Sequence, residues 1–326
     1  MECRKLGSSD LEISTIGFGA WAIGGPWMFG WGEQDDEKSI RTIHKTLDLG
    51  VNWIDTAAVY GLGHSEKVVA RAIKGRRDEV IVASKCGLVW DDKGVVDRIL
   101  NAKSVRQELE NSLRRLEVDC IDLYQVHWPT EERYHLEVWE EMSRFVEEGK
   151  IRYAGVSNFD VNQMKPLQEI LPITSLQPPY SMLVRDIEAE IFPFVKENNI
   201  GIVAYGPMFH GLLTGKYNQQ TLANLAEDDW RRNNPQFKEP QLSINLQLVD
   251  GIKSIAKYLG TTSAMLSIAW DLAHEEVTSA IVGLREESQP EQIVGAADIK
   301  LSNDVMQEIA RLILKRDEAI AAVNEG

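Results

Sequence analysis

Cysteine is scarce in this chain, and the few cysteines form no pattern that would cross-link a fold. The 326 residues contain three, at Cys3, Cys86 and Cys120, and none belongs to a CxxC motif. A disulfide framework, typical of small secreted proteins, needs an even set of cysteines at closer spacing. We therefore expect reduced thiols and a cytoplasmic protein.

Metal-binding motifs and long apolar segments are also missing. The six histidines are scattered, with no HExxH motif and no Cys/His cluster, so no bound metal is expected. No stretch approaches the roughly 18 apolar residues of a membrane-spanning helix. The N-terminal sequence MECRKLGSSD lacks the apolar core of a signal peptide. A membrane is therefore not an expected partner.

Positive charge is in deficit. The chain has 35 Lys and Arg residues against 50 Asp and Glu residues, which gives a net charge of −15 and a pI near 4.9. An acidic surface repels phosphate groups, so neither nucleic acid nor an anionic membrane surface is an expected partner. With 44% hydrophobic and 26% charged residues, the composition is that of a globular protein rather than a disordered one.

Short apolar runs alternate with segments of helical period along the whole chain. The predicted strands are residues 15–18, 53–55, 80–84, 121–125, 153–156, 175–177, 200–205 and 280–282. The predicted helices are residues 35–49, 65–73, 104–116, 132–148, 161–171, 187–198, 245–259, 263–273 and 302–323. The strands lack polar alternation, as expected when both faces are covered, and each gap between them holds a helix.

This pattern predicts the α/β class and a single domain over residues 1–326, a (β/α)8 TIM barrel. An open doubly wound sheet is the alternative. Two segments fall outside the repeat. Residues 4–14 contain a Gly-Ser-Ser-Asp turn and predict an N-terminal β-hairpin that could close the barrel floor. Residues 216–242 form a long loop of the kind that often serves as a lid or binding loop.

Two glycine motifs resemble phosphate-binding loops without their full pattern. Residues 17–22 match GxGxxA, but Gly24, Gly25 and Pro26 follow at once, where a dinucleotide-binding turn must open a helix. Residues 211–216 are one residue short of a P-loop, and Tyr217 stands where Ser or Thr would hold magnesium. Neither motif therefore predicts a nucleotide site.

Four chemically capable side chains follow consecutive predicted strands. Asp55 ends the second strand and Tyr60 follows it, Lys85 comes after the third, and His127 after the fourth. In a barrel of parallel strands the carboxyl ends of the strands meet at one mouth, where active sites lie. Each side chain taken alone has an ordinary structural interpretation, such as a helix cap, a packed ring or a solvated charge. The coincidence of all four at one mouth predicts a catalytic site.

These four groups suit proton transfer to a carbonyl oxygen. Asp55 can pair with a buried Lys85, and this cation is expected to lower the pKa of the Tyr60 phenol, which would become a proton shuttle. His127 can donate a hydrogen bond that orients a substrate oxygen. The group contains no strong nucleophile and no free pair of carboxylates, which disfavours covalent hydrolysis and glycoside cleavage. Hydride transfer to an aldehyde or ketone fits best, and the hydride must come from a cofactor.

At these residues the sequence resembles the aldo-keto reductases. The segment IDTAAVYGLGHSE at residues 54–66 is similar to one family signature, and NSLRRLEVDCIDLYQVHWP at 111–129 is similar to a second. GVSNF at 155–159 is similar to the segment that contacts nicotinamide. The resemblance covers nearly the whole chain. It implies a TIM barrel with long cofactor and substrate loops, and it implies that Asp55, Tyr60, Lys85 and His127 form the catalytic tetrad, with Tyr60 as general acid and base.

The resemblance also implies a nicotinamide cofactor laid across the barrel mouth. Its expected contacts are Ser157, Asn158 and Gln177 at the carboxamide, Tyr205 on the nicotinamide ring, Gly206, Met208 and Gly211 around the pyrophosphate, Lys216 and Arg231 near the phosphates, and Gly283, Arg285 and Gln289 at the adenine ribose. NADP(H) is the cofactor usual for the family. Glu286 stands where a basic residue often holds the 2′-phosphate, and Ile293 replaces an expected asparagine, so NAD(H) remains an alternative.

Tryptophan is abundant, with nine residues, and several lie in the loops after the first, third and fourth strands. Trp21, Trp27 and Trp128 are expected to line the substrate pocket. An apolar wall with few polar groups accepts many compounds, so the expected partner is a small-molecule carbonyl or alcohol whose identity the sequence does not give.

Two other functions stay open at this stage. The first is a cofactor-sensing binding protein, similar to the channel beta subunits that share this barrel, which would bind nicotinamide and turn over slowly. The second is an unrelated TIM-barrel hydrolase or aldolase in which Lys85 forms a Schiff base. Asp55 beside Lys85 disfavours the second function, because it would keep the amine protonated.

Overall fold

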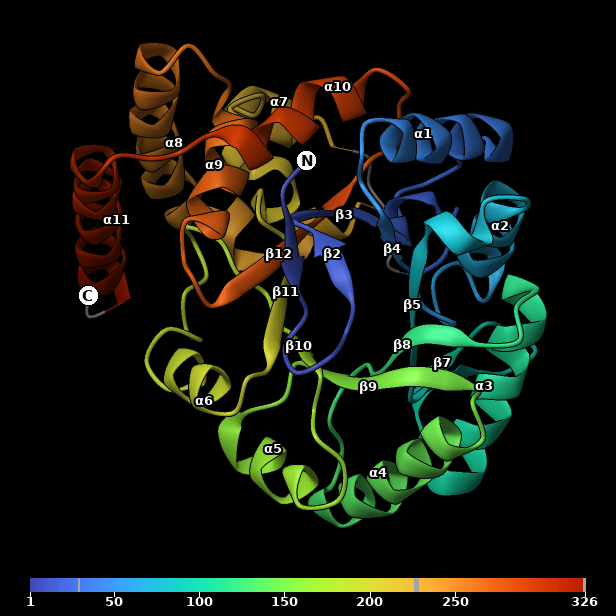
Figure 1. Ribbon diagram of the computed structural model, residues 1–326. Coiled ribbons are helices and arrows are strands. Elements are labelled where there is room, and N and C mark those ends of the chain that lie inside the picture. The colour runs from blue at the N-terminus through green and yellow to red at the C-terminus, as the bar shows by residue number, and fades with distance from the viewer. Residues whose placement is uncertain (29, 226–228, 325–326) are drawn as a thin grey trace.

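The computed structural model describes residues 1–28, 30–225 and 229–324, and its centre is a closed barrel of eight parallel strands (Figure 1). In chain order the strands are β3 (Ile16–Gly19), β4 (Trp53–Asp55), β5 (Ile81–Cys86), β8 (Ile121–Val126), β9 (Ile151–Ser157), β10 (Ser175–Gln177), β11 (Gly201–Tyr205) and β12 (Val277–Gly283). Each strand pairs with its neighbours in sequence order, and β12 pairs with β3 to close the barrel. The (β/α)8 prediction is confirmed, and the open-sheet alternative is wrong.

Helices surround the barrel, as Figure 1 shows. They are α1 (Asp36–Asp48), α2 (His64–Ile73), α3 (Ala102–Leu116), α4 (Glu132–Glu147), α5 (Val161–Gln168), α6 (Ile191–Glu197), α8 (Gln241–Tyr258), α9 (Ser263–Leu272) and α11 (Asn303–Asn324). Two short helices, α7 (Gln219–Ala223) and α10 (Gln289–Ile293), were not predicted. Helix α6 begins four residues later than the sequence indicated, and α8 begins four residues earlier.

The N-terminal hairpin closes one end of the barrel. Strands β1 (Cys3–Lys5) and β2 (Glu12–Ser14) pair antiparallel, and in Figure 1 they lie in dark blue across the barrel opening. Leu6, Leu11 and Ile13 are buried in one cluster with Trp53 and Leu123, which point inward from β4 and β8. Burial of these apolar side chains excludes water from that end, so the prediction of a closed floor is confirmed.

A second hairpin was not predicted. Strands β6 (Leu88–Trp90) and β7 (Val96–Arg98) pair antiparallel directly after β5, on the side of the barrel where Lys85 lies. Their side chains are partly or fully exposed, and the apolar run Leu88–Trp90 is only three residues long, so the sequence pattern did not indicate this pair of strands. Within the described part of the chain, no helix has both the length and the apolar character required to cross a membrane.

Helix α9 carries an aspartate in a place that suits an apolar residue. Asp271 is fully buried, and neither carboxylate oxygen has a hydrogen-bond partner among the described residues. Burial raises the pKa of Asp271 well above its usual value, because a charged carboxylate without partners is costly in a low-dielectric interior. Folding therefore favours the protonated form of this side chain.

Asp271→Asn is expected to stabilise the fold at alkaline pH. A carboxyl whose folded pKa is raised destabilises the protein once the pH exceeds the unfolded value near 3.9, and the penalty grows as the pH rises. At pH about 8 the variant should gain about 1–3 kcal/mol in urea unfolding, and the gain should disappear toward pH about 4. The exposed Asp186→Asn serves as the matched control, without effect at either pH. A gain that does not depend on pH would contradict the explanation.

Candidate active site

Four predicted side chains meet at the carboxyl ends of β4, β5 and β8. The Nζ atom of Lys85 lies 2.9 and 2.7 Å from the two carboxylate oxygens of Asp55 and 2.9 Å from the carbonyl oxygen of Thr56. It also lies 3.3 Å from the hydroxyl oxygen of Tyr60. The ring of His127 makes an edge contact with the ring of Tyr60, with centroids 5.7 Å apart. An ammonium, a carboxylate, a phenol and an imidazole therefore share one site.

Burial decides the charge states in this cluster. Lys85 and Asp55 are only 1% and 3% exposed, so each needs the other as a partner. Burial lowers the pKa of Lys85, and the carboxylate of Asp55 opposes that effect. Burial, together with the positive charges of Lys85 and Arg98, lowers the pKa of His127 well below its usual value. His127 is therefore a neutral imidazole at physiological pH and can donate one N–H hydrogen bond.

The pKa of Tyr60 is shifted in the direction opposite to the one expected from the sequence. Burial raises the pKa of Tyr60 well above its usual value, and the negative charge of Asp55 and the nearby phenol of Tyr205 act in the same direction. The expectation that Lys85 lowers the pKa of Tyr60 considered only the charge of the ammonium. Desolvation disfavours the charged phenolate, and this effect is larger than the attraction of Lys85. In this structure the phenol therefore keeps its proton and is set up as a donor.

A network of amides and hydroxyls adjoins the four residues. The side-chain amide of Gln177 donates to Asp55, at 2.8 Å, and the hydroxyl of Ser157 donates to the carbonyl oxygen of Gln177, also at 2.8 Å. Asn158 donates to the carbonyl oxygen of His127 and accepts from the hydroxyl of Tyr205, at 2.9 Å. The structure thus brings these four predicted residues next to Asp55 and His127.

Aromatic side chains form one wall beside the site. The ring of Trp27 lies 6.4 Å from that of Tyr60, and Trp21 lies 5.4 Å from Trp31 and 5.8 Å from Trp230. His210 packs edge-on against Trp230 at 4.6 Å. The wall therefore joins the loop after β3 to the predicted long loop.

Comparisons with known proteins identify the family of this chain. The sequence profile of the aldo/keto reductase family matches residues 15–314. The chain belongs to this family. It is 37% identical to the aldo-keto reductase YhdN of Bacillus subtilis over 316 residues, covering 96% of this chain and 94% of that protein. It is 32% identical to the NADH-specific methylglyoxal reductase of Escherichia coli over 329 residues, covering 96% and 99%.

Solved structures show the same similarity. The glycerol dehydrogenase of Gluconobacter oxydans superposes with a TM-score of 0.87 at 36% sequence identity, covering 97% of this chain and 96% of that one. Members of the aldo-keto reductase family are oxidoreductases that use nicotinamide cofactors and act on small carbonyl compounds. This chain therefore belongs to a family of such enzymes.

The residues present fit a nicotinamide cofactor. Gly206 follows β11 with a positive φ of 74°, and the space where a Cβ would stand is open, so a ligand can approach the backbone there. The buried indole nitrogens of Trp31 and Trp230 have no hydrogen-bond partner among the described residues. Such donors suit a bound molecule that brings its own acceptors. Met208 and Gly211 lie just beyond Gly206, where Met208 precedes the 3-10 segment Phe209–Thr214, which is kinked at His210 and Gly211.

The charged residues predicted for the phosphates differ in their surroundings. Lys216 is exposed, whereas Arg231 is only 7% exposed and already bonded. Two of its guanidinium nitrogens donate to the carboxylate of Asp229 and a third donates to the hydroxyl of Tyr217, at 2.7 Å, while its plane stacks 4.9 Å from the Trp31 ring. Arg231 therefore holds the long loop of residues 216–242 against the aromatic wall. A contact between Arg231 and a cofactor phosphate stays a prediction.

The segment predicted for the adenine ribose is ordered by its own side chains. The amide oxygen of Gln289 accepts from the backbone N–H groups of Arg285 and Glu286, at 2.7 and 3.0 Å. Arg285 donates to Gln34, at 2.8 Å, and Glu286 forms an ion pair with Lys38 of α1. Gly283 ends β12 and is exposed. Gln289 therefore shapes this turn, and its contact with adenine remains a prediction.

Sequence reasoning missed His210 and Arg98, which lie next to predicted residues. The guanidinium of Arg98 lies over the Trp128 ring, 4.9 Å from its centroid, and its charge acts on His127. Arg98 belongs to the unpredicted β6–β7 hairpin, and no local pattern in the sequence places it near His127. His210 follows the predicted strand that ends at Tyr205, and only its position after that strand could have indicated it.

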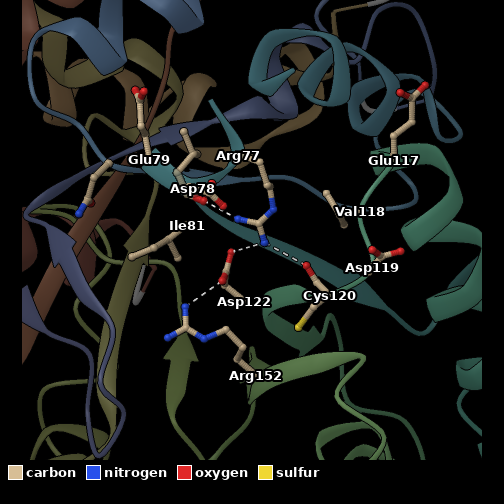
Figure 2. Close-up of a pocket in the computed structure, with 12 residues that line it drawn as sticks. Arg77, Asp78, Glu79, Ile81, Glu117, Val118, Asp119, Cys120, Asp122 and Arg152 are labelled. Atoms are coloured by element: carbon tan, nitrogen blue, oxygen red, sulfur yellow. Dashed lines mark hydrogen bonds and ion pairs between the residues drawn. The ribbon is translucent and has the colours of Figure 1, made fainter. Parts of the chain in front are cut away.

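A separate pocket lies at the other end of the barrel. Figure 2 shows this cavity of about 630 Å³ near the starts of β5 and β8, where Arg77 and Arg152 both pair with Asp122. Lys85 and His127 stand at the opposite ends of the same strands. None of the predicted site residues lines the pocket. Among the described residues, no group of three or more His, Cys, Asp or Glu side chains could hold a metal ion.

Proposed function

We propose that this chain acts as one domain that reduces aldehydes and ketones reversibly to alcohols with NAD(P)H, with Tyr60 as general acid. The observation that supports this reaction is the contact between the Tyr60 hydroxyl and the Lys85 ammonium, 3.3 Å apart, next to the neutral imidazole of His127. A nicotinamide cofactor, when bound, supplies the hydride that reduces the carbonyl carbon. The proton must then come from the protein.

Each of the four residues has a defined task in this proposal. Tyr60 donates its hydroxyl proton to the substrate oxygen, and the ammonium of Lys85 stabilises the phenolate that forms. Asp55 fixes the Lys85 side chain through two hydrogen bonds. His127 donates an N–H to the same substrate oxygen and holds it near Tyr60. Trp27 is next to the Tyr60 ring and, with Trp21 and Trp128, would exclude water from the substrate.

Ser157, Asn158 and Gln177 would orient the carboxamide, and Tyr205 would pack on the ring beside them. We propose NADP(H) as the favoured cofactor, with Arg285 as the nearest cation for the 2′-phosphate, and NAD(H) as the alternative. The Lys38–Glu286 ion pair bears on this choice, since Glu286 could instead accept the ribose hydroxyl of NAD(H). Fluorescence titration with NADPH and NADH in parallel measures the preference directly.

A turnover assay tests the reaction itself. Purified protein should oxidise NADPH or NADH only when a carbonyl compound is added, with 4-nitrobenzaldehyde and methylglyoxal as first substrates. Cofactor binding without turnover over a broad carbonyl panel would contradict the proposal and favour the cofactor-sensing alternative. A borohydride-trapped adduct on Lys85 would instead indicate Schiff-base chemistry.

The raised pKa of Tyr60 predicts different alkaline behaviour in the two directions. Reduction uses the protonated phenol, which persists, so kcat for reduction should stay constant between about pH 7.5 and 9.5. Oxidation needs the phenolate, so kcat/KM for an alcohol should rise steadily with pH up to about 10. Cofactor binding measured at each pH is the control. An alkaline loss of reduction with an apparent pKa near 8 would contradict the assignment.

A further inference from the structure

A buried carboxylate lies behind the active site, on the outer side of the barrel. Glu108 belongs to α3 and is 6% exposed, on the face of the helix that packs against the strands. One carboxylate oxygen accepts from the backbone N–H of Gly87 at 2.8 Å, and the other accepts from the hydroxyl of Ser104 at 3.2 Å. The next backbone N–H along the chain, that of Leu88, acts in favour of the charged form of the same carboxylate. The proposed reaction assigns Glu108 no role.

The turn that Glu108 holds connects two parts of the active site. Lys85 lies two residues before Gly87 in β5, and Leu88 begins the β6–β7 hairpin. The carbonyl oxygen of Cys86 accepts from the backbone N–H of His127, at 3.0 Å. Gly87 has a φ of 92°, so this turn depends on contacts from its surroundings to keep a conformation that few residues adopt.

The β6–β7 hairpin connects this turn to residues next to His127 on the other side of the active site. Arg98, at the end of β7, lies over the Trp128 ring next to His127. Glu108 of α3 contacts the turn at Gly87, directly before the hairpin begins. Without this contact, the start of the hairpin would be held by the pairing of Leu88 with Arg98 and by the packing of Leu100 near Gly87.

We propose that Glu108 is a positioning residue, whose carboxylate fixes the 86–88 turn and thereby the placement of Lys85 and of the hairpin beside His127. The inference deepens the proposed carbonyl reduction and rests on it for its kinetic part. Glu108 contacts neither substrate nor cofactor and acts only through the backbone. The ionised form is the one in which both carboxylate oxygens accept, one from the Gly87 N–H and the other from the Ser104 hydroxyl.

This placement makes the turn sensitive to pH near neutrality. Burial raises the pKa of Glu108 to about 7, opposed by the hydrogen bonds from Gly87, Ser104 and Leu88 and by the charge of Arg115. The other ionisable groups facing it are the Cys86 thiol of β5 and the Tyr124 phenol of β8, and burial raises the pKa of each. Glu66 of α2 lies beyond them, paired with Arg115. Near pH 7 the thiol and the phenol keep their protons, so among these three groups only Glu108 changes its charge, and the hold on the turn is lost as the pH falls through about 7.

Two measurements on Glu108→Gln test the inference. The first is hydrogen exchange at the Gly87 amide at pH about 8, where loss of a charge-assisted bond should accelerate exchange roughly tenfold over the wild type. Glu110→Gln is the matched control, because Glu110 lies on the same helix but faces outward to Lys150. Unchanged protection at Gly87 in Glu108→Gln would overturn the inference, whether or not the protein has any activity.

The second measurement is the pH profile of reduction. The wild type should lose kcat below about pH 7, whereas Glu108→Gln should lack this acid limb and show at all pH values the low kcat of the acidic wild type, about three- to tenfold below the maximum. KM should change little. An acid limb that persists in Glu108→Gln would overturn the inference even if exchange is faster. Absence of turnover in the wild type would refute the proposed function, and exchange at Gly87 would still decide whether Glu108 holds the turn.

Discussion

Lys85→Met is expected to lower the free energy of unfolding by about 3–5 kcal/mol near neutral pH. The substitution leaves the Asp55 carboxylate, 3% exposed, without the ammonium that contacts both of its oxygens. Gln177 would remain as a neutral donor to one oxygen, which does not balance a buried charge. Urea unfolding followed by far-UV circular dichroism measures the loss. The active site should also lose reduction, because Tyr60 no longer has a cation beside its developing phenolate.

Two further variants separate the buried pair from a general effect of removing lysine. Lys196→Met removes an ammonium whose side chain is 61% exposed and paired with Glu275, and should change stability by less than about 0.5 kcal/mol. The double variant Asp55→Asn with Lys85→Met should be more stable than Lys85→Met alone, because no unpaired buried charge remains. If the losses in unfolding free energy caused by Asp55→Asn and by Lys85→Met simply add in the double variant, the Lys85–Asp55 pair does not stabilise the fold in the way proposed.

Tyr60→Phe is expected to lower kcat for carbonyl reduction by about 100-fold to 10,000-fold, while the Kd for NADPH or NADH changes little. The variant removes the hydroxyl that lies 3.3 Å from the Lys85 ammonium and leaves the ring, which packs against His127 and Trp27. The loss therefore concerns proton donation rather than packing. Steady-state kinetics with 4-nitrobenzaldehyde, combined with fluorescence titration of the cofactor, separates the two quantities.

Tyr153→Phe provides the matched control. The hydroxyl of Tyr153 accepts from the backbone N–H of Asp10 in the loop of the N-terminal hairpin, at the far end of the barrel from Tyr60. This variant should keep wild-type kcat. Equal losses in both variants would indicate that removal of any hydrogen-bonded tyrosine hydroxyl disturbs the barrel, and would remove the support for Tyr60 as the donor.

The barrel itself could be predicted from the sequence because its signal is local. Strands such as β5 and β8 are buried on both sides and therefore read as short apolar runs, and the helices between them carry an apolar period. The positions of Asp55, Tyr60, Lys85 and His127 follow from the rule that strand ends converge. Their spatial proximity was therefore predictable without coordinates.

The features that escaped prediction depend on contacts distant in sequence. Arg231 pairs with Asp229 and lies over the ring of Trp31, 200 residues earlier in the chain, and no local pattern indicates the contact with Trp31. Strand β6 consists of three apolar residues that are only partly buried, and β7 contains Asp97 and Arg98, so neither strand shows the alternation of apolar and polar residues that marks a half-buried strand. The direction of the Tyr60 pKa required its degree of burial, which the sequence alone did not give.

The most direct test of the central claim follows one deuterium atom. Reduction of 4-nitrobenzaldehyde with cofactor that carries deuterium at the transferable position should give an alcohol with one deuterium on the former carbonyl carbon, and mass spectrometry detects it. The wild type and Tyr153→Phe should form this product, and Tyr60→Phe should form it only at a residual rate. Product without deuterium, or full deuterium transfer at wild-type rate by Tyr60→Phe, would contradict hydride transfer coupled to proton donation from Tyr60.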